Sequence, residues 1–323
     1  MVQDVQHEPI DAVITWVDGS DPAQQQNRQS FMGAMPHLFH ENAINPHRWA
    51  CNGEIYLCLE SLEHNAPWLR KIWIVVDAQS PDLSRLSAAL RAKLQLVDHT
   101  EIFADHQDLL PTFNSLAIET FLWNIPGLSE RFIYFNDDVF LTAPCQKADF
   151  FTTGGPILRG AWADFSALQD DPVHMADPAK FNHYMQLNAA GLCGVPSQRL
   201  LRTAHVAHPC LRSTMAQLHS RFHAAFRKNA GYRLRDIRQF SPQSLHNHAC
   251  ILQKSARLHP VKDHYHIYSG QGVDAADGTI AALLHQIKEN PSIKMLCVND
   301  LPQLEALYPE IRTWLTQVIT RAP

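Results

Sequence analysis

The amino-acid sequence predicts an α/β fold built on a doubly wound, mostly parallel sheet. Three short apolar runs do not alternate with polar residues, which is typical of strands that are buried on both faces. Helical patterns lie between these runs, and an alternation of strand and helix indicates parallel strands joined by right-handed crossovers. The strands are expected at residues 12–17, 72–76 and 132–135, and the helices at 54–64, 81–93 and 112–123.

Acidic residues follow each of the three predicted strands. Asp18 and Asp21 come after the first, Asp77 after the second, and Asp137 with Asp138 after the third. Ligands of open α/β sheets bind beyond the carboxyl ends of the strands, so we expect these carboxylates to converge. Converging carboxylates repel one another unless a cation lies among them, and such oxygen ligands suit Mg²⁺ or Mn²⁺. The pattern therefore predicts a metal-bound diphosphate substrate.

Local backbone chemistry is the alternative for some of these acids. Asp21 lies directly before a proline, an arrangement typical of a helix N-cap. Asp18 lies directly before a glycine and could make only a turn, and Asp77 could do the same. Two adjacent acids after a fully apolar strand are harder to explain as a turn. The pair Asp137 and Asp138 is therefore the stronger prediction of a functional site.

Composition and motifs exclude several classes of protein. The chain has 323 residues, of which 46% are hydrophobic and 18% charged, as expected for a globular protein with a large core. A net charge of −5 argues against a nucleic-acid partner. The absence of a P-loop, of GxGxxG after a strand and of GxSxG argues against an NTPase, a dinucleotide dehydrogenase and a common serine hydrolase.

The predicted location is the cytoplasm. Residues 1–9 contain no apolar stretch of a secretory signal, and no uncharged apolar run approaches the length of a membrane span. Seven cysteines occur without a CxxC pair, which favours reduced thiols.

The chain contains nineteen histidines, and some occur as closely spaced pairs. Residues two positions apart point to opposite faces of a strand, and no pair is matched by a second one at structural-zinc spacing. We interpret them as surface or capping residues, with a histidine-rich metal-binding protein as an alternative. The pairs are His205/His208, His246/His248 and His264/His266.

Long strings of the sequence closely resemble the first two conserved regions of the Stealth family. This is a family of sugar-1-phosphate transferases of bacterial capsule and exopolysaccharide synthesis, related to the animal enzyme that makes the mannose 6-phosphate tag. Weaker matches to its third and fourth regions lie at 205–252, with RLR at 233–235, and at 293–300, which reads IKMLCVND. The strong matches are IDAVITWVDGSD (10–21), Arg48 leading into GEIYLCLESLEHNAPWLRKIWIVVDAQSP (53–81), and LPTFNSLAIETFLWNIPGLSERFIYFNDDVFL (110–141).

The resemblance implies a phosphotransferase. An acceptor hydroxyl would attack the β-phosphorus of a UDP-sugar, such as UDP-N-acetylglucosamine, releasing UMP and forming a phosphodiester in a capsular or extracellular polysaccharide. Such a reaction needs charge neutralisation, alignment and a base. The alternatives are a metal-dependent glycosyltransferase that releases UDP and a non-catalytic nucleotide-sugar-binding protein.

The resemblance also implies roles for individual residues. Catalytic roles fall to Asp137 and Asp138 of the NDD motif, to His205 as base or phosphate partner, and to Arg235 as a bidentate phosphate ligand. One position departs from the family, because Cys51 stands where an acidic residue is usual. Substrate binding is expected of Asp18, Asp21, Arg48, Asn114, Glu119 and Asn136, and binding of Mg²⁺ or Mn²⁺ of Asp137, Asp138, Asn299 and Asp300.

The expected organisation is a single catalytic domain over residues 1–323, with a Rossmann-like, GT-A-like sheet and an additional helical portion. The α/β core would span 10–149, a mainly helical insertion with the third motif 150–253, and a closing segment with the fourth motif and C-terminal helices 254–323. Expected partners are a UDP-sugar donor and an oligosaccharide or polysaccharide acceptor, with no nucleic acid. Peripheral association with a polysaccharide assembly complex at the inner face of the membrane is a further option, because polysaccharide assembly takes place there.

Overall fold

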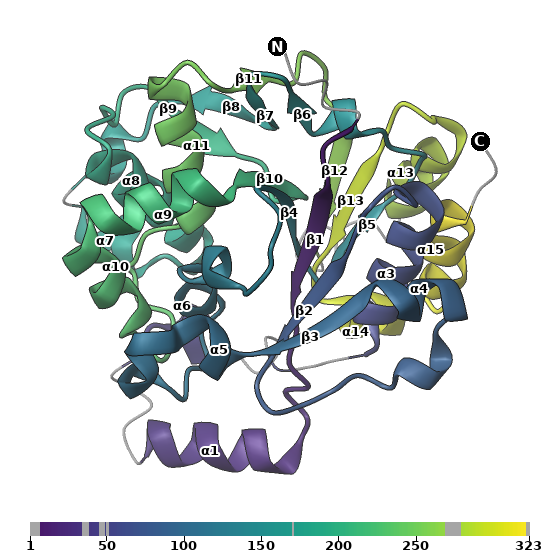
Figure 1. The fold of residues 1–323 in the computed structure, drawn as a ribbon, viewed down its shortest axis with the longest axis horizontal. Helices are drawn as coiled ribbons and strands as arrows, with labels where there is room; N and C mark the ends of the chain where they lie inside the picture. Colours follow the sequence, from purple (N-terminus) through teal and green to yellow (C-terminus); the bar gives the residue numbers. More distant parts are fainter. Residues whose placement is uncertain are drawn as a thin grey trace.

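A computed structural model describes residues 7–33, 39–44, 49, 52–169, 171–268 and 279–320. Its centre is a five-stranded sheet in the order β10-β4-β1-β2-β3 (Figure 1). The strands β3, β2, β1 and β4 are parallel, and β10 is antiparallel to β4. The strands of this sheet are β1 (Ile10–Thr15), β2 (Ile72–Val76), β3 (Leu94–Asp98), β4 (Arg131–Asn136) and β10 (His208–Leu211).

The strand order reverses between β1 and β4, and this reversal determines where a ligand can bind. From β1 the chain first builds outward through β2 and β3, then returns to add β4 on the other side of β1. Thr15 pairs with Asn136, so both strands end at the same level. Open α/β sheets bind their ligands in the crevice beyond such a switch point.

Helices cover both faces of the sheet, as in a doubly wound fold. Figure 1 shows α7 to α11 gathered on one side of the molecule, and α3, α13 and α15 on the other. The helices are α1 (Pro22–Met32), α2 (Glu41–Ile44), α3 (Glu54–Asn65), α4 (Ala88–Lys93), α5 (His99–Phe103), α6 (Ser115–Glu119), α7 (Pro172–Ala176), α8 (Phe181–Leu192), α9 (Arg212–Arg221), α10 (His223–Ala230), α11 (Pro242–Leu252), α13 (Thr279–Glu289), α14 (Leu301–Leu307) and α15 (Ile311–Ile319).

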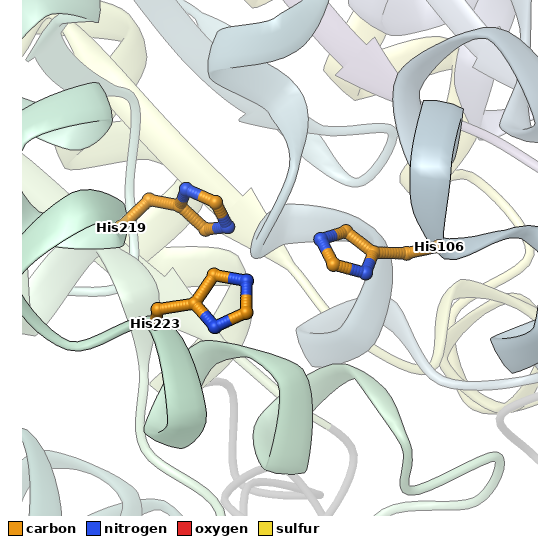
Figure 2. A group of neighbouring side chains, drawn as sticks. All are labelled: His106, His219 and His223. Atoms are coloured by element: carbon orange, nitrogen blue, oxygen red, sulfur yellow. The ribbon is translucent and has the colours of Figure 1, made fainter.

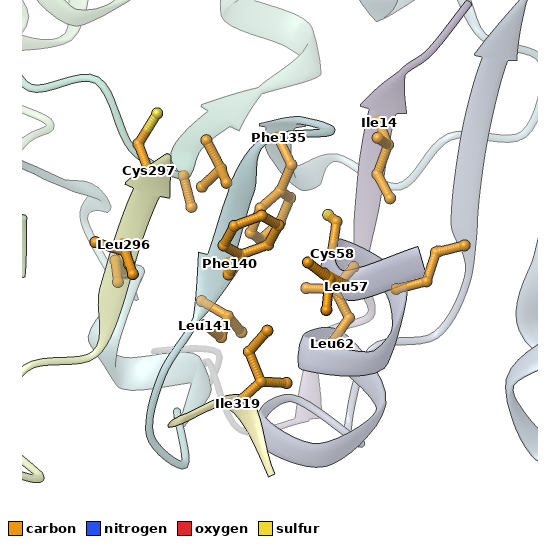
Figure 3. Close-up of a cluster of buried hydrophobic side chains, with 14 of the residues drawn as sticks. Ile14, Leu57, Cys58, Leu62, Phe135, Phe140, Leu141, Leu296, Cys297 and Ile319 are labelled. Atoms are coloured by element: carbon orange, nitrogen blue, oxygen red, sulfur yellow. The ribbon is translucent and has the colours of Figure 1, made fainter. Parts of the chain in front are cut away.

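Alternate residues of β1 pack into two separate cores. Ala12 and Ile14 join the larger core with α3, α15 and a second sheet, whereas Val13 joins the core formed with α5 and α6. Figure 3 shows part of the larger core, in which side chains of β1, α3, β4, β5 and β13 meet. Burial on both faces explains why the strand sequences are continuously apolar.

A second sheet brings the end of the chain beside the end of β4. β5 (Val139–Leu141) follows β4 after a two-residue turn and pairs antiparallel with β13 (Met295–Val298), which pairs parallel with β12 (His264–Ile267). Residues 299 and 300 therefore lie near the turn at 137–138. The remaining strands form two small sheets: β6 (Phe151–Thr152), β7 (Gly155–Leu158) and β11 (Arg257–Leu258), and β8 (Gly160–Ala163) with β9 (Leu200–Thr203).

The predicted fold class is confirmed, with corrections to element boundaries. The strand at 72–76 is confirmed, while the other two begin one or two residues earlier than predicted. The helix predicted over 81–93 is wrong in its first half, because Leu86 is extended and Ser87 caps a new helix through a bond from Leu90 N to its hydroxyl (3.0 Å). The helix predicted over 112–123 ends at Glu119 and is followed only by a 3₁₀ turn, η6 (Leu122–Asn124).

The span from 150 to 253 contains strands as well as helices, and β10 from this span joins the central sheet. The closing segment contains the two expected amphipathic helices, α14 and α15.

Among the described residues the six cysteines are free thiols. None of the helices there has the length and apolar character that crossing a membrane requires.

Candidate active site

The turn after β4 presents two acidic side chains at the switch point of the sheet. Asp137 and Asp138 are half-buried, and the backbone oxygen of Asp138 accepts a hydrogen bond from Val298 N (2.9 Å). Among the described residues, Asp138 Oδ1 is buried without a nitrogen or oxygen hydrogen-bond partner. A buried carboxylate oxygen without such a donor can bind a cation or accept a substrate proton.

A third carboxylate, which was not predicted from the sequence, interacts with this pair through its charge. Glu54 is buried in the first turn of α3, and its Oε2 accepts a hydrogen bond from Asn52 N (2.7 Å). Burial raises the pKa of Asp138 to about 6, and the negative charge of Glu54 adds to the rise. Burial, followed by the charges of Asp138 and Glu54, holds the pKa of Asp137 well above its usual range. The three carboxylates therefore repel one another when no cation is present.

Asn299 and His266 hold Asp138 in place. The side-chain amide of Asn299 donates to Asp138 Oδ2, and Asn299 Oδ1 hydrogen-bonds His266 Nε2. The neighbouring Asp300 has a left-handed backbone (φ 58°) and makes no side-chain cap bond to α14. Asp300 still occupies the N-cap position of α14, where its backbone oxygen accepts from Leu304 N (3.1 Å), and metal binding by Asn299 and Asp300 stays a prediction.

His205 lies on the loop between β9 and β10 and faces the acid pair. One ligand atom each of His205, Asp138 and Cys297 lies within 4.8 Å of the others. His205 is exposed and its ring is 5.3 Å from the ring of His266, centroid to centroid. The Cys297 thiol is buried, and burial raises its pKa well above the usual range, so it is a neutral neighbour. His205 therefore lies within reach of the Asp138 carboxylate, and its role as base or phosphate partner stays a prediction.

Arg235 lies near enough to the acid pair to interact with its charge, and it is linked to a buried polar chain. Its Nη2 donates to Ser115 Oγ (2.6 Å), and its charge attracts Glu119 and Asp138. Tyr134 OH donates to Glu119 Oε1 (3.1 Å) and lies 2.9 Å from Thr15 Oγ1. Burial raises the pKa of Glu119. The predicted substrate residue Glu119 is therefore buried and interacts with Arg235 through charge, while substrate binding by Glu119 stays a prediction.

The acids after β1 take part in local hydrogen bonds. Asp21 caps α1 by accepting from Gln24 N (3.0 Å), and the carboxylate of Asp18 accepts from Ser20 N (2.9 Å). Asp77 accepts from the side chain of Gln24. These contacts match the turn and cap alternatives, while substrate binding by Asp18 and Asp21 stays a prediction.

Three further predicted residues have different surroundings. Asn114 is fully buried, caps α6 and donates to Tyr232 O (2.6 Å), which ties α6 to the segment that carries Arg235. Asn136 ends β4 beside Asp137 and is half-buried. Arg48 lies outside the described residues, as does Cys51.

The donor set suits a hard divalent cation. Mg²⁺ and Mn²⁺ prefer carboxylate oxygens, and Asp137 and Asp138 supply them. One of these is Asp138 Oδ1, which is buried and has no nitrogen or oxygen partner within the described part of the chain. A bound cation would also relieve the repulsion that raises the two pKa values. The residues present thus fit such an ion.

Comparison with known proteins decides the family. A family model for Stealth protein conserved region 1 matches residues 8–36, and one for conserved region 2 matches residues 48–157. A receptor polysaccharide phosphotransferase of Streptococcus oralis is 31% identical over 252 residues, which cover 70% of this chain and 74% of that protein. The chain belongs to the Stealth family.

Other Stealth relatives are longer than this chain. An exopolysaccharide phosphotransferase of Streptomyces coelicolor is 32% identical over 297 residues, covering 90% of this chain and 47% of that protein. The chain thus spans about half the length of this curated relative. A galactosyltransferase crystallised with donor and acceptor sugar analogues is similar over 97% of this chain and 97% of that chain, at 10% identity and a TM-score of 0.45.

The two matched Stealth regions supply only part of the candidate site. They contain Asp18, Glu54 and the acid pair, whereas His205, Arg235 and Asn299 come from residues beyond 157. Sequence analysis missed Glu54 because an acidic residue in the first turn of a helix is ordinary capping chemistry. Only its charge interaction with Asp137 and Asp138 indicates a further role.

Proposed function

We propose that this Stealth protein transfers a hexose 1-phosphate, such as N-acetylglucosamine 1-phosphate, from a UDP-sugar to a saccharide hydroxyl. The acceptor oxygen forms a bond to the β-phosphorus, the bond between that phosphorus and the bridging oxygen breaks, and UMP leaves. The product is a phosphodiester between two sugars within a capsular or extracellular polysaccharide. The curated relatives are named polysaccharide phosphotransferases, which supports this assignment.

One observation carries the proposal. Carboxylates of Asp137, Asp138 and Glu54 converge at the switch point of the sheet, with Arg235 exerting an opposite charge on Asp138. An anionic diphosphate can enter such a site only together with cations, and a metal ion with an arginine supplies them. A direct displacement at phosphorus depends on positioning and charge stabilisation, so the proposed reaction uses no covalent nucleophile.

Each side chain then has one task. Asp137 and Asp138 would hold Mg²⁺ or Mn²⁺, which when bound neutralises charge on the diphosphate. Asn299 keeps Asp138 oriented through its side-chain amide. Arg235, held by Ser115, binds phosphate oxygens of the donor. His205 removes the proton from the attacking hydroxyl. Peripheral association with a membrane assembly complex stays a prediction.

The decisive experiment separates nucleotide products. Purified chain is incubated with Mg²⁺, a panel of UDP-hexoses and a capsule-type oligosaccharide, and the nucleotides are resolved by chromatography. We expect UMP, lost in Asp138→Asn and retained in Asp105→Asn, a matched change at an exposed aspartate. Release of UDP instead would identify a glycosyltransferase. UMP release that persists unchanged in Asp138→Asn would overturn the assignment of the site.

A further inference from the structure

Three histidines that the proposed reaction does not use come together at a second place. His106 lies on the 3₁₀ segment η5 (Ala104–Leu109), His219 on α9 and His223 at the start of α10. One ring nitrogen of each lies within 4.8 Å of the other two. Figure 2 shows these nitrogens pointing toward the space between the three rings.

The spacing of the rings is close to that of a three-histidine metal site. Ring centroids are 6.0 Å apart for His106 and His219, 5.8 Å for His106 and His223, and 5.3 Å for His219 and His223. Tetrahedral Zn²⁺ with bonds of about 2 Å to nitrogen places such centroids about 5 Å apart. Small side-chain rotations therefore suffice to close the three rings around one ion.

The surroundings keep these imidazoles ready for a metal. Among the described residues, His219 Nε2 is buried and has no hydrogen-bond partner. Burial lowers the pKa of His219, and its two histidine neighbours lower it further, which favours the neutral ring that binds metals. His106 stacks on Phe121 with centroids 5.1 Å apart, so its ring is held toward the group. An unpaired buried nitrogen is costly unless a ligand uses it.

We propose that His106, His219 and His223 bind one Zn²⁺ ion at a site separate from the acid pair. Imidazole nitrogen suits zinc, and three such ligands leave the fourth position for water. The other potential ligand group of the described chain, Asp138 with His205 and Cys297, belongs to the candidate active site.

The second ring nitrogen of His106, Nδ1, must change its hydrogen-bond partner for this assignment to hold. Arg227 Nη1 lies 3.3 Å from His106 Nδ1, and the same guanidinium pairs with Asp108 (2.6 Å). A metal-bound histidine keeps a proton on its second nitrogen and usually donates it in a hydrogen bond to a carboxylate or carbonyl. Arg227 must therefore release Nδ1 when zinc binds, and Asp108 is a nearby carboxylate that can accept this hydrogen bond.

The zinc would join two parts of the chain that shape the phosphate side of the active site. The segment after α10, which leads to Arg235, already contacts the loop that contains His106. Phe113 N donates to Arg233 O (2.9 Å), and Arg233 Nη2 donates to Leu110 O (3.1 Å). A metal bound between η5, α9 and α10 would fasten the same contact. We assign the ion a positioning role rather than a chemical one.

The test measures zinc binding directly on the full chain without a histidine tag. After chelator dialysis, the protein is titrated with ZnCl₂ by calorimetry at about pH 7.5, where free histidine is neutral. In the double-variant background Asp138→Asn/His205→Gln, which removes an acid and the histidine of the other ligand group, we expect one equivalent bound with a Kd below about 1 µM. Zinc at a hundredfold excess over this Kd should raise Tm by about 5 °C.

Variants distinguish this site from general histidine binding. His219→Gln and His223→Gln in that background should lose the equivalent and the Tm shift, while His64→Gln, at an exposed histidine of α3, should keep both. Co²⁺ replacing zinc should give the intense visible bands of a tetrahedral ion, without the sulfur charge-transfer band that a thiolate ligand would add. Binding weaker than this limit, or equal in His219→Gln and its parent, would overturn the proposal.

Discussion

Asn299 donates a hydrogen bond from its side-chain amide to the carboxylate of Asp138, although 161 positions separate the two residues. The contact joins the end of β13 to the turn after β4. Asn299 is itself held by His266 through its amide oxygen. The orientation of one acid of the candidate site thus depends on residues from the last part of the chain.

This contact predicts that Asn299→Ala weakens metal use without unfolding the chain. Loss of a partner that orients a metal ligand typically costs about 10- to 100-fold in affinity or activity. We expect the UMP-release rate to fall by this factor, and more Mg²⁺ to be needed for half the maximal rate. The control is Asn182→Ala at an exposed position of α8. An unchanged Mg²⁺ dependence would argue against the orienting role.

The raised pKa of Asp138 predicts a stability effect that depends on pH. In the metal-free folded chain this carboxyl titrates near 6 instead of 3.8, so its contribution favours folding below pH 3.8 and is lost as pH rises through about 6. Asp138→Asn is neutral at every pH and keeps an acceptor for Asn299. With chelator present, this variant should gain roughly 2 kcal/mol over wild type above about pH 7, and little near pH 4.

Urea unfolding at both pH values measures that difference. Added Mg²⁺ should remove the advantage, because the ion stabilises the ionised carboxylate of wild type alone. The prediction fails if wild type is the more stable protein at the higher pH in chelator.

The buried charges of Arg235 and Glu119 predict a coupled effect on stability. Arg235→Met leaves the Glu119 carboxyl buried without its positive neighbour and should cost about 2 kcal/mol or more. Adding Glu119→Gln should recover much of this loss, since the amide keeps the hydrogen bond from Tyr134 without a charge. A double-mutant cycle by urea unfolding measures the coupling, and additive losses would show that the two residues act independently.

His205 lies beside Asp138, and if it acts as the base, added imidazole should restore activity to a variant that lacks the side chain. His205→Gly should lower the maximal rate of UMP release by about 10²- to 10⁴-fold, the usual contribution of a general base. Added imidazole should restore part of this rate, and the rescue should increase with pH as imidazole loses its proton. The same addition should do nothing for His64→Gly. A loss that imidazole cannot repair would move His205 from base to phosphate partner.

The central sheet was predictable because burial on both faces leaves a simple pattern. The strand Ile72–Val76 is continuously apolar and has the predicted ends. Helix ends were harder to place. Leu86 and Ser87 interrupt the predicted helix at 81–93, since the Ser87 hydroxyl caps a new start more favourably than the chain continues helical.

Site residues could be predicted from the sequence only where a chemically suitable side chain directly follows a predicted strand. Asp137 and Asp138 stand at a strand end, so their location followed from topology. Glu54 looks like a helix cap, and its approach to the acid pair depends on how α3 packs against β5, which no local pattern encodes. The grouping of His106 with His219 likewise depends on tertiary packing between segments more than a hundred residues apart.

Strand β10 protects one edge of the central sheet. It pairs with β4 from His208 to Leu211, and so covers the edge of the strand that ends in the acid pair. A fragment that stops at residue 157, where the second matched region ends, would leave that edge bare, and bare strand edges template aggregation. We therefore expect that the two matched regions do not fold on their own, and that gene fragments encoding them alone yield insoluble protein.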